Sequence, residues 1–183
     1  EADIVALCTP VGDILDKLHT IGPLLKPGSV VLDVGSTKSA ICAAMADLPP
    51  DIQPVGGHPM CGKESSGLTV AEPILYEDKV FVLCPLERTS PEARTLVQSL
   101  VRAIGALPTY LPPERHDRLV AAISHLPYAL AVTLVEAAEA LRGDDPLLWS
   151  LAAGGFRDTS RVAASSVPMM MDILATNREP ILE

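Results

Sequence analysis

Short apolar runs alternate with longer amphipathic segments along the first 110 residues. The runs 3–8, 29–35 and 79–85 lack the polar alternation of a half-buried strand, so they predict strands that are covered on both faces. Two further runs complete the set. Residues 53–59 predict a shorter strand followed by a loop, and residues 107–111 predict the last strand.

Segments with helical spacing lie between these strands, and the helices are predicted at 11–25, 36–48 and 90–105. The third helix has the clearest ends, with Ser90 as N-cap, Pro91 at the first helical position and Gly105 at the end. Ser36 is expected to cap the second helix in the same way. Strands separated by helices predict a doubly wound α/β domain with a mostly parallel sheet.

The pattern changes after residue 112. Residues 115–142 are helical, very apolar and rich in alanine, and Pro127 is expected to kink or break this helix. The rest of the chain is again helical with interruptions. We therefore predict two domains, an α/β domain at 1–112 and an all-α domain at 113–183.

The apolar helix raises the question of a membrane span. Residues 119–135 carry no formal charge, but the run is short for a bilayer and Ser124, His125 and Pro127 interrupt it. A helix buried in a subunit interface, or at the centre of a small bundle, explains the composition better. We expect no membrane contact, and a homodimer formed mainly through the helical domain.

Composition and charge narrow the class of protein. The chain has 183 residues, 48% of them hydrophobic, and a net charge of −9 without a basic cluster, which argues against a nucleic-acid partner. Its four cysteines lie far apart without CxxC spacing, which favours reduced thiols in a cytoplasmic protein and predicts no metal site. Cys8 and Cys84 stand in apolar runs and are expected to be core residues.

Small or polar residues follow three successive predicted strands. Thr9 follows the first, Ser36 the second and His58 the third. In an open parallel sheet the carboxyl ends of the strands border the ligand-binding crevice, so these side chains are expected to lie together. His58 stands in "GGHPMCG". The glycines either form a turn around an incidental histidine or bring the backbone close to a ligand that the histidine touches.

Five stretches resemble one known family. They read "ADIVALCTPV", "LDVGSTKSAI", "GGHPMCGKESSG", "HDRLVAAISHLP" and "AAGGFRDTSRVAASS". In order and spacing they are similar to the motifs of the prephenate and arogenate dehydrogenases of tyrosine biosynthesis. The resemblance covers nearly the whole chain. It implies a partial Rossmann-like domain, a helical dimerisation domain, NAD or NADP as cofactor, and oxidative decarboxylation of prephenate or arogenate.

The resemblance also implies roles for single residues. His58 would accept a hydrogen bond from the ring hydroxyl as hydride leaves the same carbon, and Ser36 would lie beside that hydroxyl and the nicotinamide. Arg161 would hold a substrate carboxylate, and its planar fork suits that task. The other implied substrate contacts are His125, Lys63, Glu64, Tyr128 and Gly154. The implied cofactor contacts are Cys8, Thr9, Pro10, Gly35 and Ser36.

Several alternatives remain open on the sequence. Arg157 is a rival for the role of Arg161, and His125 would also serve as a core histidine. His116 and Asp117 are expected to fix the start of the long helix. Tyr128 stands where many relatives have a second histidine, which puts a contact in doubt.

Other classes of function also stay open. A hydroxyacid-type dehydrogenase would use a lysine of the helical half, which has none, and a serine hydrolase would need a Gly-x-Ser-x-Gly elbow. A non-catalytic helical interaction module is the third alternative. The phosphate-binding Gly-x-Gly-x-x-Gly motif and the residue that selects NAD or NADP are not found in the sequence. We expect this chain to be the interior of a longer dehydrogenase subunit, cut at both ends.

Overall fold

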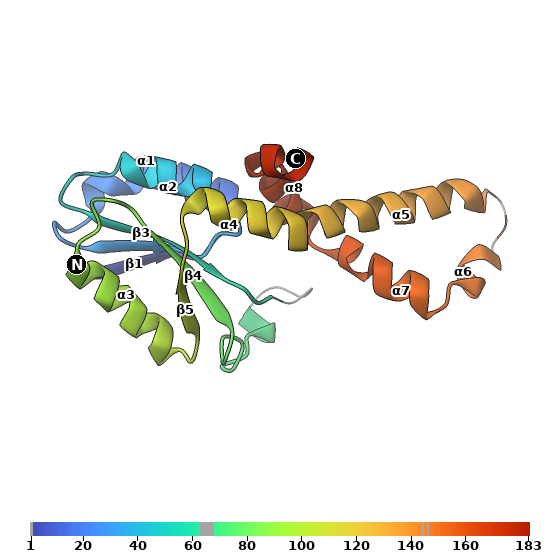
Figure 1. Ribbon diagram of the computed structural model, residues 1–183, viewed down its shortest axis with the longest axis horizontal. Coiled ribbons are helices and arrows are strands. Elements are labelled where there is room, and N and C mark those ends of the chain that lie inside the picture. The colour runs from blue at the N-terminus through green and yellow to red at the C-terminus, as the bar shows by residue number, and fades with distance from the viewer. Residues whose placement is uncertain (1, 63–67, 144, 146) are drawn as a thin grey trace.

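Five strands form one twisted sheet at one end of the molecule (Figure 1). The computed structural model describes residues 2–62, 68–143, 145 and 147–183. The strands lie side by side in chain order: β1 (Ile4–Leu7), β2 (Val30–Asp33), β3 (Gln53–Pro59), β4 (Val80–Pro85) and β5 (Leu107–Tyr110). All neighbouring pairs are parallel except β3 and β4, which run antiparallel. The predicted mostly parallel sheet is confirmed.

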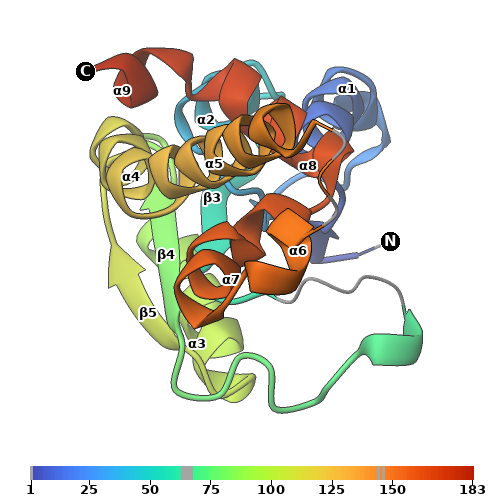
Figure 2. The same ribbon diagram turned by 90° about the vertical axis from the view of Figure 1, so that its right-hand side faces the viewer.

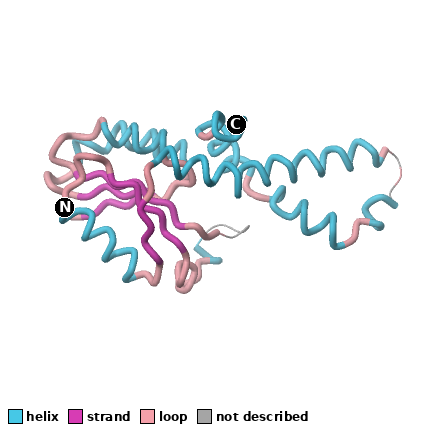
Figure 3. Tube along the Cα trace, in the orientation of Figure 1, coloured by secondary structure: helices cyan, strands magenta, loops and turns pink. Residues whose placement is uncertain are grey.

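Helices cover both faces of this sheet (Figures 1 and 3). Helices α1 (Val11–Ile21) and α2 (Ser39–Ala46) bury Val31 and its neighbours on one face, and α3 (Pro91–Ala103) packs on Val30 and Leu32 on the other. This two-sided burial explains why the strand sequences show no polar alternation.

The predicted ends of α3 are confirmed. The Ser90 hydroxyl accepts a hydrogen bond from the Ala93 amide at 3.1 Å, and Gly105 has φ of +82° just beyond the helix. Glycine suits this position because a left-handed backbone strains a residue that carries Cβ.

Strand β3 has the predicted bounds, Gln53–Pro59. It was expected to be shorter than the others, but with seven residues it is the longest of the strands in the described part of the chain. Its last five residues pair with β4, so that Gly56 lies opposite Cys84 and His58 opposite Val82. Pairing with a neighbouring strand thus outweighs the low strand propensity of Gly-Gly-His-Pro. His58 therefore belongs to a strand and not to a turn.

The second half of the chain is helical. A long helical run crosses from the sheet and extends away from it, and the later helices return along it (Figures 1 and 2). The elements in order are α4 (Pro113–Val120), a π-helical turn (Ala121–His125), α5 (Leu126–Arg142), α6 (Leu147–Leu151), α7 (Gly154–Ser160), a 3₁₀ turn (Arg161–Ala164), α8 (Val167–Thr176) and α9 (Arg178–Leu182). Two other 3₁₀ turns lie at Gly22–Leu24 and Leu68–Val70.

Pro127 does not break the long helix. The chain instead forms the π-helical turn just before it, where the wider spacing of backbone hydrogen bonds accommodates a residue without an N–H group. By length and composition alone, residues 113–142 could cross a membrane. Three polar side chains of this run, His116, Asp117 and His125, are nevertheless buried inside the protein.

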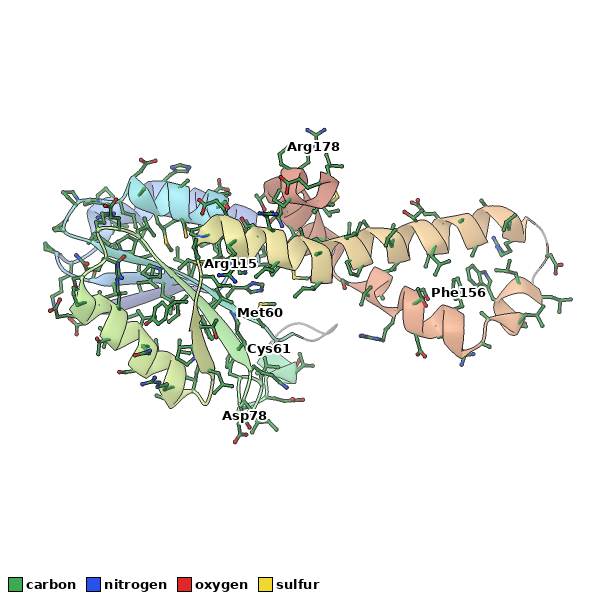
Figure 4. All side chains as sticks on the ribbon, in the orientation of Figure 1. Met60, Cys61, Asp78, Arg115, Phe156 and Arg178 are labelled. Carbon is green, nitrogen blue, oxygen red and sulfur yellow. The ribbon has the colours of Figure 1, made fainter. Side chains whose placement is uncertain are left out.

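The outer part of the helical half exposes apolar side chains. We call α5, α6 and α7 together the helical arm. Leu141 is 82% exposed and Leu151 is 77% exposed. Other exposed apolar residues of the arm are Leu126, Leu130, Leu147 and Trp149. The rings of Trp149 and Phe156 pack with their centroids 5.6 Å apart. The Phe156 side chain lies between α5 and α7 (Figure 4).

Candidate active site

A cavity of about 550 Å³ lies where the carboxyl ends of the strands meet the helical half. Ser36 and His58 line it from the sheet domain, and His125 lines it from the π-helical turn. The structure thus brings these three predicted site residues together. Met60 and Cys61 continue the lining just beyond β3, below the long helix (Figure 4). The remaining lining residues are Gly62, Ile123, Ser124, Val162, Ser165, Ser166, Met169, Met170 and Ile173.

A buried ion pair fixes the strand ends on the sheet side. Asp33 ends β2, and its carboxylate accepts hydrogen bonds from the amides of Gly35 at 2.7 Å and Gly57 at 2.9 Å. It also pairs with the ammonium of Lys38, which donates a second bond to the Gly57 carbonyl at 2.6 Å. Both side chains are fully buried. Gly57, the residue before His58, is therefore held at both its N–H and its C=O.

The packing of the strands explains why a glycine stands at position 57. A Cβ at this position would lie 2.4 Å from the Asp33 carbonyl oxygen and 2.9 Å from the Phe81 ring. Only glycine permits this approach of β2, β3 and β4. The glycine therefore serves the packing of the strands and the loop beside His58.

His58 is joined to a second histidine and a carboxylate. Its Nδ1 lies 2.8 Å from Nε2 of His116, and Nδ1 of His116 lies 2.8 Å from Oδ1 of Asp117. Burial lowers the pKa of His58 well below 6.5, and the positive charge of Lys38 acts in the same direction. His58 is therefore neutral near pH 7 and can accept a hydrogen bond.

The contacts of Asp117 bear on two sequence predictions about helix starts, and both predictions were wrong. Its carboxylate accepts hydrogen bonds from the amides of Lys38 at 2.7 Å and Ser39 at 2.8 Å, and so caps α2 from another helix. Ser36 is consequently not the cap of α2, and its side chain is left to the cavity. His116 and Asp117 do not fix the start of the long helix either, because α4 begins three residues earlier with Pro112 as its N-cap.

The pKa of Asp117 is lowered from its usual value. Burial disfavours the carboxylate, but the hydrogen bonds from His116, Ser39 and Lys38 outweigh that cost. Asp117 is therefore a stable buried anion at neutral pH.

His125 is oriented by Asn177, and no sequence pattern around Asn177 predicts a role in the site. The Asn177 amide nitrogen donates to the Asp117 carbonyl at 2.9 Å and lies 2.9 Å from Nδ1 of His125. Because a carbonyl can only accept, the amide orientation is fixed and Nδ1 of His125 must accept. Burial lowers the pKa of His125 to about 4. Neutral His125 therefore carries its proton on Nε2.

Other predicted residues lie farther from the cavity. Arg161 is exposed at the start of the 3₁₀ turn, next to the lining residue Val162, and Arg157 is exposed on α7. Tyr128 packs with Met170 and Ile173 in the core of the helical half. Gly154 is exposed at the start of α7. Lys63 and Glu64 lie outside the described residues.

The cysteine predictions had mixed outcomes. Cys84 is buried as expected, but Cys8 is exposed just beyond β1, so its prediction as a core residue was wrong. The apolar run ends at the sheet edge one residue earlier than the composition suggested. Thr9 and Pro10 follow at the same edge, and Gly35 follows β2.

Comparison with known proteins places the chain in a family. The profile described as "Prephenate dehydrogenase, nucleotide-binding domain" matches residues 1–109, and "Prephenate dehydrogenase, dimerization domain" matches 112–183. The whole chain is 37% identical to prephenate dehydrogenase of Bacillus subtilis and spans 50% of that protein.

Two solved structures agree over almost the entire chain. Prephenate dehydrogenase from Aquifex aeolicus, in complex with hydroxyphenyl propionate and NAD+, matches 98% of this chain with a TM-score of 0.89 and 32% identity. Arogenate dehydrogenase from Synechocystis matches 99% with a TM-score of 0.82 and 34% identity. This chain covers 63% and 65% of those two chains. The sequence profiles and the shared architecture show that the chain belongs to the prephenate dehydrogenase family.

Proposed function

We propose that the protein catalyses the NAD- or NADP-dependent oxidative decarboxylation of prephenate to 4-hydroxyphenylpyruvate, or of arogenate to tyrosine. The observation that carries this proposal is the neutral His58 in the cavity at the strand ends. Its Nδ1 is engaged with His116, so Nε2 is the atom available to a substrate. Family membership supplies the class of reaction.

The side chains suit the chemistry of this reaction. Hydride leaves the ring carbon that bears the hydroxyl, the ring carboxylate leaves as carbon dioxide, and the electron pair of the broken C–C bond completes the aromatic ring. Nε2 of His58 accepts a hydrogen bond from the hydroxyl and holds its proton while carbonyl character develops. The proton returns to the oxygen as the ring becomes aromatic, so no net proton is released.

The cavity edge fits a nicotinamide cofactor, which would supply the hydride acceptor when bound. The Thr9 hydroxyl is buried, and in the described part of the chain it has no hydrogen-bond partner. A carboxamide placed beyond β1 would satisfy it. We propose Cys8, Thr9, Pro10, Gly35 and Ser36 as the residues of this chain that hold the nicotinamide end.

We propose that the substrate is held from the helical half. His125 presents an Nε2–H donor in the cavity, whereas His58 presents an acceptor. Arg161 follows α7 beside the lining residue Val162, and we propose that it binds a substrate carboxylate. Tyr128 would act by supporting Met170 and Ile173, which line the cavity. Lys63, Glu64 and Gly154 remain proposed substrate contacts on the family resemblance alone.

The exposed apolar side chains of the helical arm favour association. We propose that the protein is a cytoplasmic homodimer and that the arm forms most of the interface. Light scattering of the full-length protein should show a dimer at micromolar concentration. A stable and active monomer would contradict this part of the proposal.

The decisive experiment offers prephenate and arogenate, each with NAD and with NADP, to the full-length protein. Reduced nicotinamide is followed by absorbance, and the aromatic product by chromatography. We expect turnover with at least one pair and loss of turnover in His58→Asn. A protein that binds cofactor but oxidises neither substrate would instead be a dehydrogenase of another specificity. Binding of neither cofactor nor substrate would favour a non-catalytic module.

A further inference from the structure

His58, His116 and Asp117 are linked by two hydrogen bonds, and the chemistry of the groups determines which atom donates in each bond. We propose that Asp117 and His116 are positioning residues that hold His58 with its proton on Nδ1, leaving the Nε2 lone pair for the substrate hydroxyl. The assignment of the tautomer rests on the geometry of these two hydrogen bonds. Its catalytic consequence rests on the proposed function.

The proton positions can be followed from the carboxylate outward. Asp117 can only accept, so His116 places its proton on Nδ1, at 2.8 Å. Neutral His116 then presents a lone pair on Nε2, and His58 must donate to it from Nδ1, again at 2.8 Å. A doubly protonated His116 would reverse the second bond. That state would place another cation in the interior, where His116 is 1% exposed and the ammonium of Lys38 is already buried.

Asp117 itself has little freedom to move. Its two carboxylate oxygens are held by the first amides of α2, from Lys38 and Ser39, and its backbone carbonyl accepts from Asn177 of the C-terminal helices. The positive end of the α2 dipole favours the carboxylate as well. The orientation of the His58 ring is therefore set by contacts to both halves of the protein.

The same geometry predicts a change in pH dependence. The titratable groups that act on His58 are His116, Lys38, His125 and Asp117. Among them, Asp117 alone raises the pKa of His58. In Asp117→Asn the pKa of His58 should therefore fall further. The acid limb of the pH–turnover profile, where His58 becomes protonated, should move to lower pH while maximal turnover drops. A merely structural defect would reduce the amount of active enzyme without moving the limb.

Variants of His116 test the positioning role. In His116→Leu the acceptor for the Nδ1 proton is lost, and we expect turnover to fall by about 10²-fold with a small change in KM. In His116→Gln the amide oxygen can face His58 while the amide nitrogen faces Asp117, so turnover should partly recover. Thr89→Val is the matched control. It removes a different buried hydrogen bond, from the Thr89 hydroxyl to the Pro54 carbonyl, at the opposite end of β3 from His58. It should lower thermal stability but leave turnover per folded enzyme and the pH profile unchanged.

Nitrogen-15 NMR of histidine-labelled full-length protein reads the tautomer without any assay. We expect His58 protonated on Nδ1 in the wild type, and a shift toward Nε2 in His116→Leu. If wild-type His58 carries its proton on Nε2, the inference is wrong even when the enzyme is active. If the tautomer is as expected but neither substrate is oxidised, the proposed function fails and the assignment of the tautomer stands. Wild-type turnover in a folded His116→Leu would overturn the positioning role.

Discussion

The two sides of the cavity are built differently. On the sheet side, buried charges and backbone hydrogen bonds hold the strand ends beside His58, with the carboxylate of Asp33 accepting from two amides and one ammonium. On the helical side, most lining residues are apolar, including Ile123, Val162 and Met170. The first side can place a reacting atom accurately, whereas the second can adapt its packing to the shape of a substrate.

The contrast continues away from the cavity. The sheet domain buries its apolar side chains between α1, α2 and α3, while the helical arm leaves many of its own exposed. A domain with a closed core is stable on its own contacts, but the arm presents apolar area that a partner would cover. The difference suggests that the sheet side fixes the chemistry and that the arm depends on assembly.

The largest effect is expected from removing the imidazole of His58, the group that we propose accepts the substrate proton. His58→Asn should lower turnover by about 10²–10⁴-fold with little change in cofactor binding. Because the pKa of His58 lies well below 6.5, the wild type should keep its activity below pH 6.5 and lose it only as the pH falls through the lowered pKa. Steady-state kinetics across pH measure both effects. The exposed His19 on α1 supplies the control, His19→Asn. Turnover within about threefold of wild type would make His58 a structural residue only.

The second prediction breaks the support beneath His58. Lys38→Met leaves the Asp33 carboxylate buried without its cation, which should cost about 3–5 kcal/mol of unfolding free energy. Denaturant titration measures the loss. Lys26→Met is the control, because the pair of Lys26 with Asp3 is largely exposed, is screened by solvent and should contribute little to the unfolding free energy. Equal effects of the two variants would show that the sheet side is not held by its buried charges.

The sequence predicted the elements well because their signals are local. Apolar runs located the strands, and the Ser90 cap and Gly105 ended α3 as expected. The crevice at the strand ends was also found, since the order of strands in a parallel sheet places Ser36 and His58 at one edge. Residues that act through near neighbours in sequence were therefore predictable.

The errors share one physical cause. Ser36 was expected to cap α2, but the cap is Asp117, which lies 78 residues from Ser39. Asn177 contacts Asp117 across 60 residues, and no pattern in its own surroundings points to that bond. Lys38 stands in "LDVGSTKSAI", one of the stretches that resemble the family, yet its burial with Asp33 is seen only in the folded chain. Buried polar networks depend on which elements pack together, and periodicity does not report that. The domain division at residue 112 and the roles of the site residues stay predictions.

The third prediction tests the substrate contact that we propose for the helical side of the cavity. Arg161→Lys keeps the charge but loses the planar fork. If a bound substrate carboxylate desolvates this charge pair, loss of its bidentate geometry should cost about 2–5 kcal/mol of binding. We expect a raised KM with the fold intact, measured by kinetics and circular dichroism. Arg157→Lys is the matched comparison on α7. If Arg157→Lys weakens binding and Arg161→Lys does not, the two roles are reversed.

The last and smallest effect is expected at one of the contacts that join the sheet side to the helical side. Asp172 on α8 accepts a hydrogen bond at 2.9 Å from the amide of Gly12 in the first turn of α1. This carboxylate caps a helix of the sheet domain from the helical half, and a charged group there also interacts favourably with the α1 dipole. Asp172→Ala should therefore cost about 1 kcal/mol of unfolding free energy, and Asp172→Asn less, since its amide oxygen can still accept.

Asp13→Ala on the same helix is the control for this last prediction, because Asp13 makes only an exposed pair with Lys17 at 3.0 Å. Its loss should cost a few tenths of a kcal/mol. Denaturant titration of the three variants, followed by circular dichroism for helix content and by tryptophan fluorescence, separates two outcomes. Trp149 lies on the arm, so coincident transitions in Asp172→Ala would mean that the sheet side and the helical side still unfold together. A separate, earlier tryptophan transition would show that this cap couples the rigid side of the cavity to the adaptable one. An Asp172→Ala loss no larger than that of Asp13→Ala would show that the cap does not stabilise α1.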